Sequence, residues 1–432
     1  ERVVDWAGLP IDLLVCVCRL LSAVPGLVCF RATCRSWRAA HDDLMDQRTA
    51  ARMPSPCGDD IEDQRAAPRM PPPWVVIPHG SGCTNAFTLL SVPTMQAFRW
   101  TPPGGARLRC VGASGGWIAG AYIDGDYAIR FSLLNPLTGA RVDVPAALGW
   151  ARVPACYSSQ DEEISLCNTV HKVAFSPSPT EHDFAVAVVT RTHRPAGGKA
   201  VVFTRAGCGG WCALAGLGCL EPGGHYKRRV LDVAYYGGKF YYMTMRGDVW
   251  VIDMAAPSPS PAPLATFAAP TMPPGLVYGR KHLAFAGDGA LHVVCSLIER
   301  CYSTPPAVHM LVQRYDPSCA EQGSSSSPWA QATCLRGYSF LIGDLNQTLS
   351  VRVDGDDGAW LRPDSVYFTN IPLCSLFAES TRCSEGGAWV FNLATGDIRR
   401  PTTGEGRCRN YEAERDWCWE SNKCVWIMPS MR

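Results

Sequence analysis

The cysteines and histidines of this sequence are the side chains best suited to bind a metal ion or to act as nucleophiles. There are 21 cysteines and 9 histidines. No Cys-x-x-Cys pair occurs, and no two histidines have the i, i+4 spacing of a zinc-binding helix. A loose group of Cys408, Cys418 and Cys424 has no matching pair elsewhere in the chain. We therefore expect neither a metal ion nor a cofactor.

Acidic residues are the next candidates for metal binding or catalysis. Residues 354–358 resemble part of a calcium loop, but the glycine comes one place early and Ser365 stands where the loop needs glutamate. Glu162 and Glu163 are adjacent, so on a strand they would point to opposite faces. The chain also has no His-Glu-x-x-His motif and no Gly-x-x-x-x-Gly-Lys phosphate loop. These observations favour a protein that is not an enzyme.

The composition indicates an ordered chain with many turns. Apolar residues make up 47% of the 432 residues, with 40 glycines and 34 prolines. The net charge of +1 argues against a highly charged nucleic-acid-binding protein. No apolar run is long enough to span a bilayer, and the short segment 13–18 lacks the features of a signal peptide. We expect reduced cysteines and an intracellular protein, in the nucleus and/or cytoplasm, without nucleic-acid or membrane partners.

Residues 1–46 differ in kind from the rest and predict a small helical module. One apolar stripe of a helix contains Leu13, Leu14, Val17, Leu20 and Leu21. Pro25 and Gly26 end that pattern, a short apolar segment follows, and Ser36 is placed to cap a third helix. Three short helices in so few residues bury little apolar surface, so we expect the module to need a partner.

The rest of the chain predicts a linker followed by β structure. Residues 47–73 are rich in proline and indicate an extended linker. From residue 74 onward, short β-type runs are separated by turn dipeptides. These are Asp124-Gly125, Gly237-Gly238, Gly247-Asp248 and Asp288-Gly289.

A weak repeat overlies these hairpins. Strands end in an Asn or Asp turn at Asn135, Asp253, Asp316 and Asn392, and the longer gaps are expected to hold two units. Radial repetition of four-stranded sheets, as in a β-propeller, accounts for this pattern better than a sandwich does. The number of blades stays open.

Two short motifs lie in the N-terminal segment. Residues 9–14 read Leu-Pro-Ile-Asp-Leu-Leu, and residues 30–38 read Phe-Arg-Ala-Thr-Cys-Arg-Ser-Trp-Arg. They match the opening and the close of the F-box motif, so the segment resembles an F-box. The resemblance implies that this module binds a Skp-type adaptor and, through it, a cullin. Residues 25–28 depart from the family, which often has an acidic residue there. The adaptor contacts implied are Leu9, Pro10, Leu13, Leu14, Leu21, Phe30 and Trp37.

Three segments of the C-terminal body carry a second resemblance, at residues 335–343, 361–369 and 391–398. In these segments the body is similar to a large plant family of F-box proteins, expanded in grasses, whose propeller-like domain has no known function. The sequence therefore predicts a mainly β protein with three parts. These are an F-box helical module at residues 1–46, a Pro-rich linker at 47–73 and a β-propeller-like domain at 74–432.

The resemblances imply a non-catalytic substrate-recognition adaptor of an SCF-type (Skp-cullin-F-box) ubiquitin ligase, whose propeller recruits an unidentified target protein. Two alternatives stay open. One is a propeller enzyme or glycan-binding module with a helical cap, which would need several carboxylates facing the propeller channel. The other is a ligase-independent interaction protein that no longer binds the adaptor.

Overall fold

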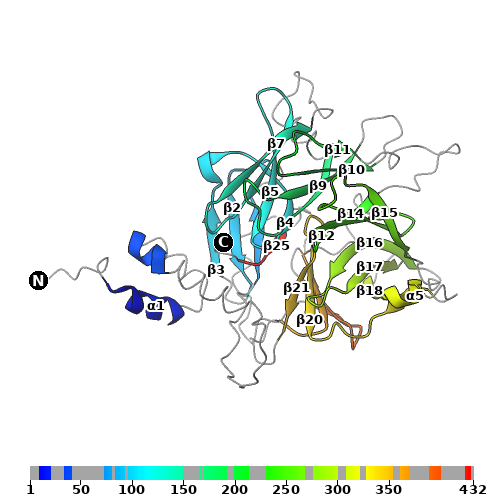
Figure 1. The fold of residues 1–432 in the computed structure, drawn as a ribbon. Helices are drawn as coiled ribbons and strands as arrows, with labels where there is room; N and C mark the ends of the chain where they lie inside the picture. Colours follow the sequence, from blue (N-terminus) through cyan, green and yellow to red (C-terminus); the bar gives the residue numbers. More distant parts are fainter. Residues whose placement is uncertain are drawn as a thin grey trace, which may run out of the picture. The chain divides into compact units, whose positions relative to one another are not determined.

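The computed structural model describes residues 9–20, 34–40, 73–79, 83–92, 96–148, 166, 169–191, 199–213, 230–267, 276–299, 308–321, 327–353, 361–369, 389–399 and 424–429. The chain divides into two compact units, Glu1–Pro72 and Pro73–Ser430. Helices characterise the described part of the first unit, and β-strands characterise the second (Figure 1). None of the helices in the described ranges has the length and hydrophobicity needed to span a bilayer.

The second unit is built from six sheets, or blades, arranged around an axis. Blade 1 contains β25 (Val425–Ile427), β1 (Trp74–Pro78), β2 (Phe87–Ser91) and β3 (Gln96–Trp100). Blade 2 contains β4 (Arg109–Ser114), β5 (Trp117–Ile123), β6 (Ile129–Leu134) and β7 (Arg141–Leu148). Blade 3 contains β8 (Val170–Phe175), β9 (Ala185–Arg191), β10 (Lys199–Arg205) and β11 (Cys212–Ala213).

The other three blades continue the ring. Blade 4 contains β12 (Val230–Tyr236), β13 (Lys239–Thr244), β14 (Asp248–Asp253) and β15 (Pro261–Thr266). Blade 5 contains β16 (Leu276–Phe285), β17 (Leu291–Glu299), β18 (Val308–Tyr315) and β19 (Trp329–Gln331), with α5 (Pro317–Glu321) between β18 and β19. Blade 6 contains β21 (Leu349–Arg352), β20 (Tyr338–Ile342), β22 (Ser365–Phe368), β23 (Trp389–Asn392) and β24 (Ile398–Arg399).

The innermost strands of successive blades contact one another, which places β25, β4, β8, β12, β16 and β21 around the axis. Blade 1 is closed by the C-terminal strand, because β25 pairs antiparallel with β1. Blade 6 departs from the expected four antiparallel strands. It has five strands, and β20 pairs antiparallel with β21 but parallel with β22.

The predicted repeat is confirmed as the turn that precedes the last strand of a blade. In blade 2, Asn135 Oδ1 accepts hydrogen bonds from the backbone N–H groups of Leu137 (3.0 Å) and Thr138 (3.2 Å). In blade 6, Asn392 Oδ1 accepts the equivalent pair. Asp253 and Asp316 accept one backbone N–H each at the corresponding turns of blades 4 and 5. The side-chain oxygen accepts backbone N–H groups that have no strand partner within the turn, so Asn or Asp is favoured there. The long gap between Asn135 and Asp253 holds blade 3.

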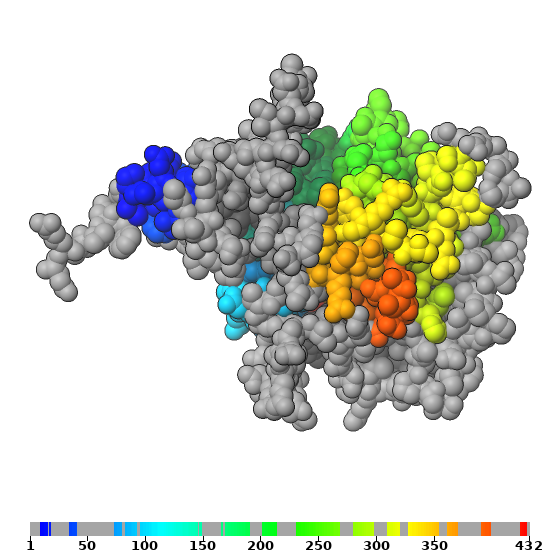
Figure 2. All heavy atoms as spheres, turned by 90° about the horizontal axis from the view of Figure 1, so that it is seen from below, coloured from blue at the N-terminus to red at the C-terminus, as the bar shows by residue number. Residues whose placement is uncertain are grey.

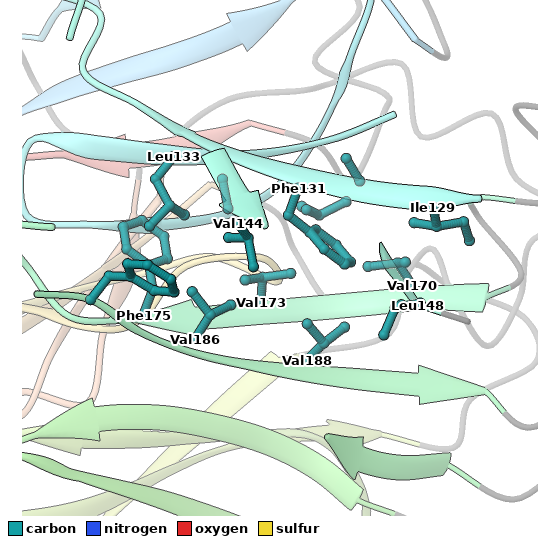
Figure 3. Close-up of a cluster of buried hydrophobic side chains, with 14 of the residues drawn as sticks. Ile129, Phe131, Leu133, Val144, Leu148, Val170, Val173, Phe175, Val186 and Val188 are labelled. Carbon is teal, nitrogen blue, oxygen red and sulfur yellow. The ribbon is translucent and has the colours of Figure 1, made fainter. Parts of the chain in front are cut away.

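Apolar side chains from facing blades form the core. Between blades 2 and 3 they interdigitate as Figure 3 shows, and burial of each one stabilises the fold by about 1.5–3 kcal/mol. The labelled residues are Ile129, Phe131, Leu133, Val144 and Leu148 from blade 2 and Val170, Val173, Phe175, Val186 and Val188 from blade 3. Similar clusters lie between blades 3 and 4, 4 and 5, 5 and 6, and 6 and 1.

The first unit contains α1 (Ile11–Leu20) and a helix at residues 35–40. Helix α1 begins after Pro10, whose carbonyl accepts the N–H groups of Leu13 and Leu14 at 3.1 Å. Ser36 lies inside the second of these helices and does not cap it, because the helix begins one residue earlier. The segment expected to form the middle helix of the module lies outside the described residues.

The imidazole of His292 makes stability depend on pH. This buried ring on β17 donates from Nδ1 to the Ala290 carbonyl at 2.9 Å and packs edge-on against Phe340. Burial, the largest cause, lowers the pKa of His292 from 6.5 to about 4. The unfolded chain therefore binds a proton before the folded chain does. The contribution of the neutral ring to the free energy of unfolding is therefore fully present above pH 6.5 and is lost as the pH falls toward 4.

We therefore expect His292→Gln to flatten the pH dependence of unfolding. The wild type should lose about 3 kcal/mol more than the variant as pH falls through this range, since one pKa unit corresponds to about 1.4 kcal/mol. Urea unfolding of both proteins at a series of pH values measures the difference. If the free energy of unfolding changed equally with pH in the two proteins, this prediction would be contradicted.

Candidate functional site

Helix α1 presents an apolar face to solvent. Leu13 is 53% exposed, Ile11 is 49% exposed, and Val17 and Pro10 are also exposed. Pro10, Leu13 and Val17 have i, i+3, i+7 spacing, so they lie along one side of the helix. Apolar residues grouped in this way on a short helix form a surface suited to a partner groove.

The opposite side of α1 forms the core of the first unit. Leu14 is only 1% exposed and packs with Val15, Cys18 and Ala40. The predicted single stripe is therefore wrong, because Leu13 and Leu14 belong to different faces of the helix. The helix is apolar on both sides, and adjacent leucines in the sequence do not show which of them faces outward.

The sequence-predicted contact residues divide accordingly. Pro10 and Leu13 are exposed, and Leu14 is buried in the core. Leu9 and Trp37 are half-buried and pack against that core. Leu21 and Phe30 lie outside the described residues.

A second candidate site is the axis of the propeller, where the inner strand edges carry backbone N–H and C=O groups without ladder partners. Residues 346–348, between β20 and β21, supply many of these partners. Asn346 Nδ2 donates to the Trp426 carbonyl at 2.6 Å, and Trp426 N–H donates to Asn346 Oδ1 at 2.9 Å. Asn346 thereby joins blade 6 to the closing strand β25 of blade 1.

Gln347 reaches three further blades. Its Nε2 donates to Ser114 Oγ at 2.6 Å and to the Phe175 carbonyl at 3.1 Å, on blades 2 and 3. Its Oε1 accepts the Tyr235 N–H of blade 4. The next residue, Thr348, donates from its hydroxyl to the Leu283 carbonyl of blade 5 at 2.8 Å. Three consecutive polar residues of blade 6 thus bond to all five other blades. We call residues 346–348 the axial segment.

Two short sequence motifs contain residues that form the hydrogen bonds of the axial segment. Asn346-Gln347-Thr348 has the sequence of a glycosylation acceptor, but Asn346 is 1% exposed and its amide holds Trp426. Gly112-Ala113-Ser114-Gly115-Gly116 has the Gly-x-Ser-x-Gly pattern of a hydrolase nucleophile turn. Here the turn joins two antiparallel strands, and Ser114 Oγ accepts a hydrogen bond from Gln347. Neither motif serves the chemistry that its pattern suggests.

Two carboxylates near the axis, Asp232 and Asp344, are paired with cations. Lys172 of β8 forms a buried ion pair with Asp232 of β12. Asp232 also accepts the N–H groups of Val233 (2.9 Å) and Leu283 (2.7 Å), so it links blades 3, 4 and 5. Between blades 5 and 6, Arg280 pairs with Asp344 beside a small pocket. In the described ranges, no group of three His, Cys, Asp or Glu side chains is placed to hold a metal ion.

A strained turn on blade 6 is a third feature. Arg336 and Gly337 have φ values of 55° and 82°, and Tyr338 N–H donates to the Leu335 carbonyl at 3.1 Å. These values define a type I′ turn, which Asn-Gly favours. Arginine in this left-handed conformation costs about 1 kcal/mol. Asp364 fixes the turn by accepting the N–H groups of Leu335 and Gly337.

Six radial sheets around a bonded axis define a six-bladed β-propeller, a fold suited to protein–protein interaction. More particularly, the chain belongs to the KIB1-4 beta-propeller family, a family of plant proteins, since the family model matches residues 89–392. No match to a curated protein was found.

Three solved structures are among those that match the chain at low similarity. The Cps50 (Swd1) β-propeller domain of Myceliophteria thermophila is 10% identical with a TM-score of 0.29, covering 77% of this chain and 90% of that one. AofleA from Arthrobotrys oligospora is 10% identical with a TM-score of 0.28, covering 84% and 90%. Apo AztD from Citrobacter koseri is 10% identical with a TM-score of 0.29, covering 77% and 95%. Likeness at these scores adds nothing to the fold assignment.

Proposed function

We propose that the chain is a substrate-recognition adaptor of an SCF-type ubiquitin ligase. In this role the helical unit binds a Skp-type adaptor and, through it, a cullin, while the propeller holds a target protein. The chain makes and breaks no bond itself, and its contribution is to raise the local concentration of target lysines near the charged ubiquitin carrier. The proposal includes an intracellular location, in the nucleus or the cytoplasm.

The observation that carries the proposal is the exposed apolar face of α1. Pro10 and Leu13 of this face belong to the Leu-Pro-x-Asp-Leu-Leu motif, and the side chains of the face are not members of the described core of their own unit. Full burial of a leucine side chain yields about 2 kcal/mol, so a groove that covers two or three of these residues gains useful affinity. A rigid propeller in the same chain supplies the second surface that an adaptor needs.

A pull-down of the full chain with purified Skp-type adaptor tests the proposal. We expect Leu13→Ala combined with Val17→Ala to reduce adaptor affinity at least about 10-fold, because each truncation removes apolar area that the partner would bury. Both side chains are exposed, so the unfolding midpoint should stay within experimental error of the wild type.

The matched control is Leu14→Ala on the same helix. This change empties the core of the unit and costs about 2–5 kcal/mol, so it reduces capture by unfolding the helical unit. Circular dichroism separates the two effects. Undiminished capture by the Leu13/Val17 double variant would contradict the proposed adaptor face.

The alternative of a ligase-independent interaction protein shares the propeller and differs only in adaptor binding. Failure of the wild-type chain to capture any Skp-type adaptor would favour it. The alternative of a propeller enzyme has less support. Near the described part of the axis, Asp232 and Asp344 each face a cation, so neither is placed as a free general base.

A further inference from the structure

One surface turn of blade 5 lies between two tyrosines from the neighbouring blades. A Cβ at Gly287 would come within 2.3 Å of the Tyr338 ring of blade 6, and one at Gly289 within 3.0 Å of the Tyr236 hydroxyl of blade 4. A side chain at residue 287 would displace the Tyr338 ring, and the φ of 84° at residue 289 favours glycine. The turn at residues 287–289 and its two tyrosines therefore form one continuous surface across blades 4, 5 and 6.

Aromatic rings form one end of this surface. Tyr236 stacks on Phe285 with ring centroids 4.5 Å apart and an angle of 4° between the rings, and Tyr241 packs against Phe285 at 4.7 Å. Tyr236 remains 37% exposed. A flat, supported and partly exposed ring is a common anchor for a partner side chain.

Cations form the other end. Asp288, at the centre of the turn, lies 3.9 Å from Arg314 and 3.6 Å from Arg336. One carboxylate therefore serves two guanidinium groups at long distances. The Arg336 side chain is 62% exposed, so most of its donors face solvent. Exposed ion pairs of this length hold a guanidinium weakly, and a second carboxylate can compete for it.

The backbone of Arg336 gives an independent reason to regard its side chain as functional. Arg336 occupies the left-handed position of the type I′ turn, where asparagine would be relaxed. Strain of this kind concentrates at binding sites, because the side chain that causes it is needed there. We call Tyr236, Phe285, Asp288, Arg314, Arg336 and Tyr338 the blade 4–6 patch. Segments of blades 5 and 6 that contribute to it, in yellow and orange, lie side by side in Figure 2.

We propose that the blade 4–6 patch binds an acidic peptide segment of a partner protein, with Asp or Glu next to an aromatic residue. The peptide carboxylates take bidentate hydrogen bonds from Arg336 and Arg314, and the aromatic side chain packs on Tyr236. The proposal rests on the proposed function, in that it names the chemistry of the target that the propeller recruits. The patch places the 62% exposed Arg336 side chain beside a partly exposed aromatic ring, which suits a short acidic segment better than a nucleic-acid backbone.

A random peptide library displayed on phage and selected against the full-length chain tests this proposal. We expect the selected peptides to share acidic residues beside an aromatic one. Synthetic copies, titrated by fluorescence anisotropy, should lose at least about 10-fold in affinity for Arg336→Asn. The same substitution should leave the thermal unfolding midpoint unchanged or raise it, because asparagine relaxes the turn. Lost binding then cannot be attributed to lost folding.

The matched control is Arg99→Gln, which removes one exposed positive charge from β3 of blade 1 and should leave affinity unchanged. Several results would overturn the proposal: no selected peptides, selected peptides without net negative charge, or equal binding by Arg336→Asn and the wild type. A phosphoserine version of the peptide that binds more tightly than the Glu version would overturn the choice of a carboxylate. Preferential binding of single-stranded DNA over the peptide would also overturn it. None of these measurements involves the Skp-type adaptor, so failure here and failure of adaptor capture are distinguishable.

Discussion

Replacing Gln347 by leucine is expected to lower the free energy of unfolding of the propeller by about 3 kcal/mol or more. The substitution introduces an apolar side chain of similar size and removes the amide. Three buried groups on three different blades then lose their hydrogen bonds to Gln347. These groups are Ser114 Oγ, the Phe175 carbonyl and the Tyr235 N–H. Each buried group left without a hydrogen bond costs about 1–3 kcal/mol. Urea unfolding followed by tryptophan fluorescence measures the change.

Gln331→Leu is the matched control for that measurement. Gln331 is an exposed residue at the end of β19, far along the blade from the axis. The same chemical change there should alter stability by no more than about 0.5 kcal/mol. If both variants lost the same small amount, the axial segment would not hold the blades together.

Lys172→Met is expected to cost about 3–5 kcal/mol, because it leaves the Asp232 carboxylate buried without its cation. The methionine fills similar space, so little of the loss comes from a cavity. The two backbone N–H groups that donate to Asp232 remain, and they limit the loss in free energy of unfolding. The unfolding midpoint in urea measures the effect.

The double variant Lys172→Met, Asp232→Asn shows whether this loss reflects the ion pair itself. Asparagine retains one oxygen to accept a backbone N–H but carries no charge. The double variant should therefore lose less than the sum of the two single variants, with a coupling of about 1–3 kcal/mol. Additive losses would contradict the pairing of Lys172 with Asp232.

The sequence predicted the turns that repeat within each blade better than the contacts between distant segments of the chain. The turns at Asn135, Asp253, Asp316 and Asn392 depend on side chains that bond within their own turn, so local sequence contains the whole signal. The parallel pairing of β20 with β22 depends on residues far apart in the chain. The same is true of Gln347, an ordinary polar residue in the sequence, which meets its partners only when the ring closes.

The candidate adaptor face was predictable in position but not in detail. The motif places apolar residues on α1, and periodicity groups Leu13 with Leu14. Which of the two faces solvent depends on Ala40, which packs against Leu14 from a different helix. The blade 4–6 patch had no sequence signal beyond its turn dipeptides, because its arginines come from two blades that only the fold brings together.

Closure of the ring by β25 has a consequence for how the protein is made. Trp74 near the start of the propeller pairs with Ile427, so blade 1 lacks its innermost strand while the intervening residues are synthesised. At roughly 5–20 residues per second, that interval lasts from tens of seconds to about a minute. Throughout it, β1 exposes an apolar strand edge that can pair with other chains. Chaperones that cover strand edges during translation should therefore matter more for the yield of this protein than for that of a propeller whose blades are each completed in sequence order.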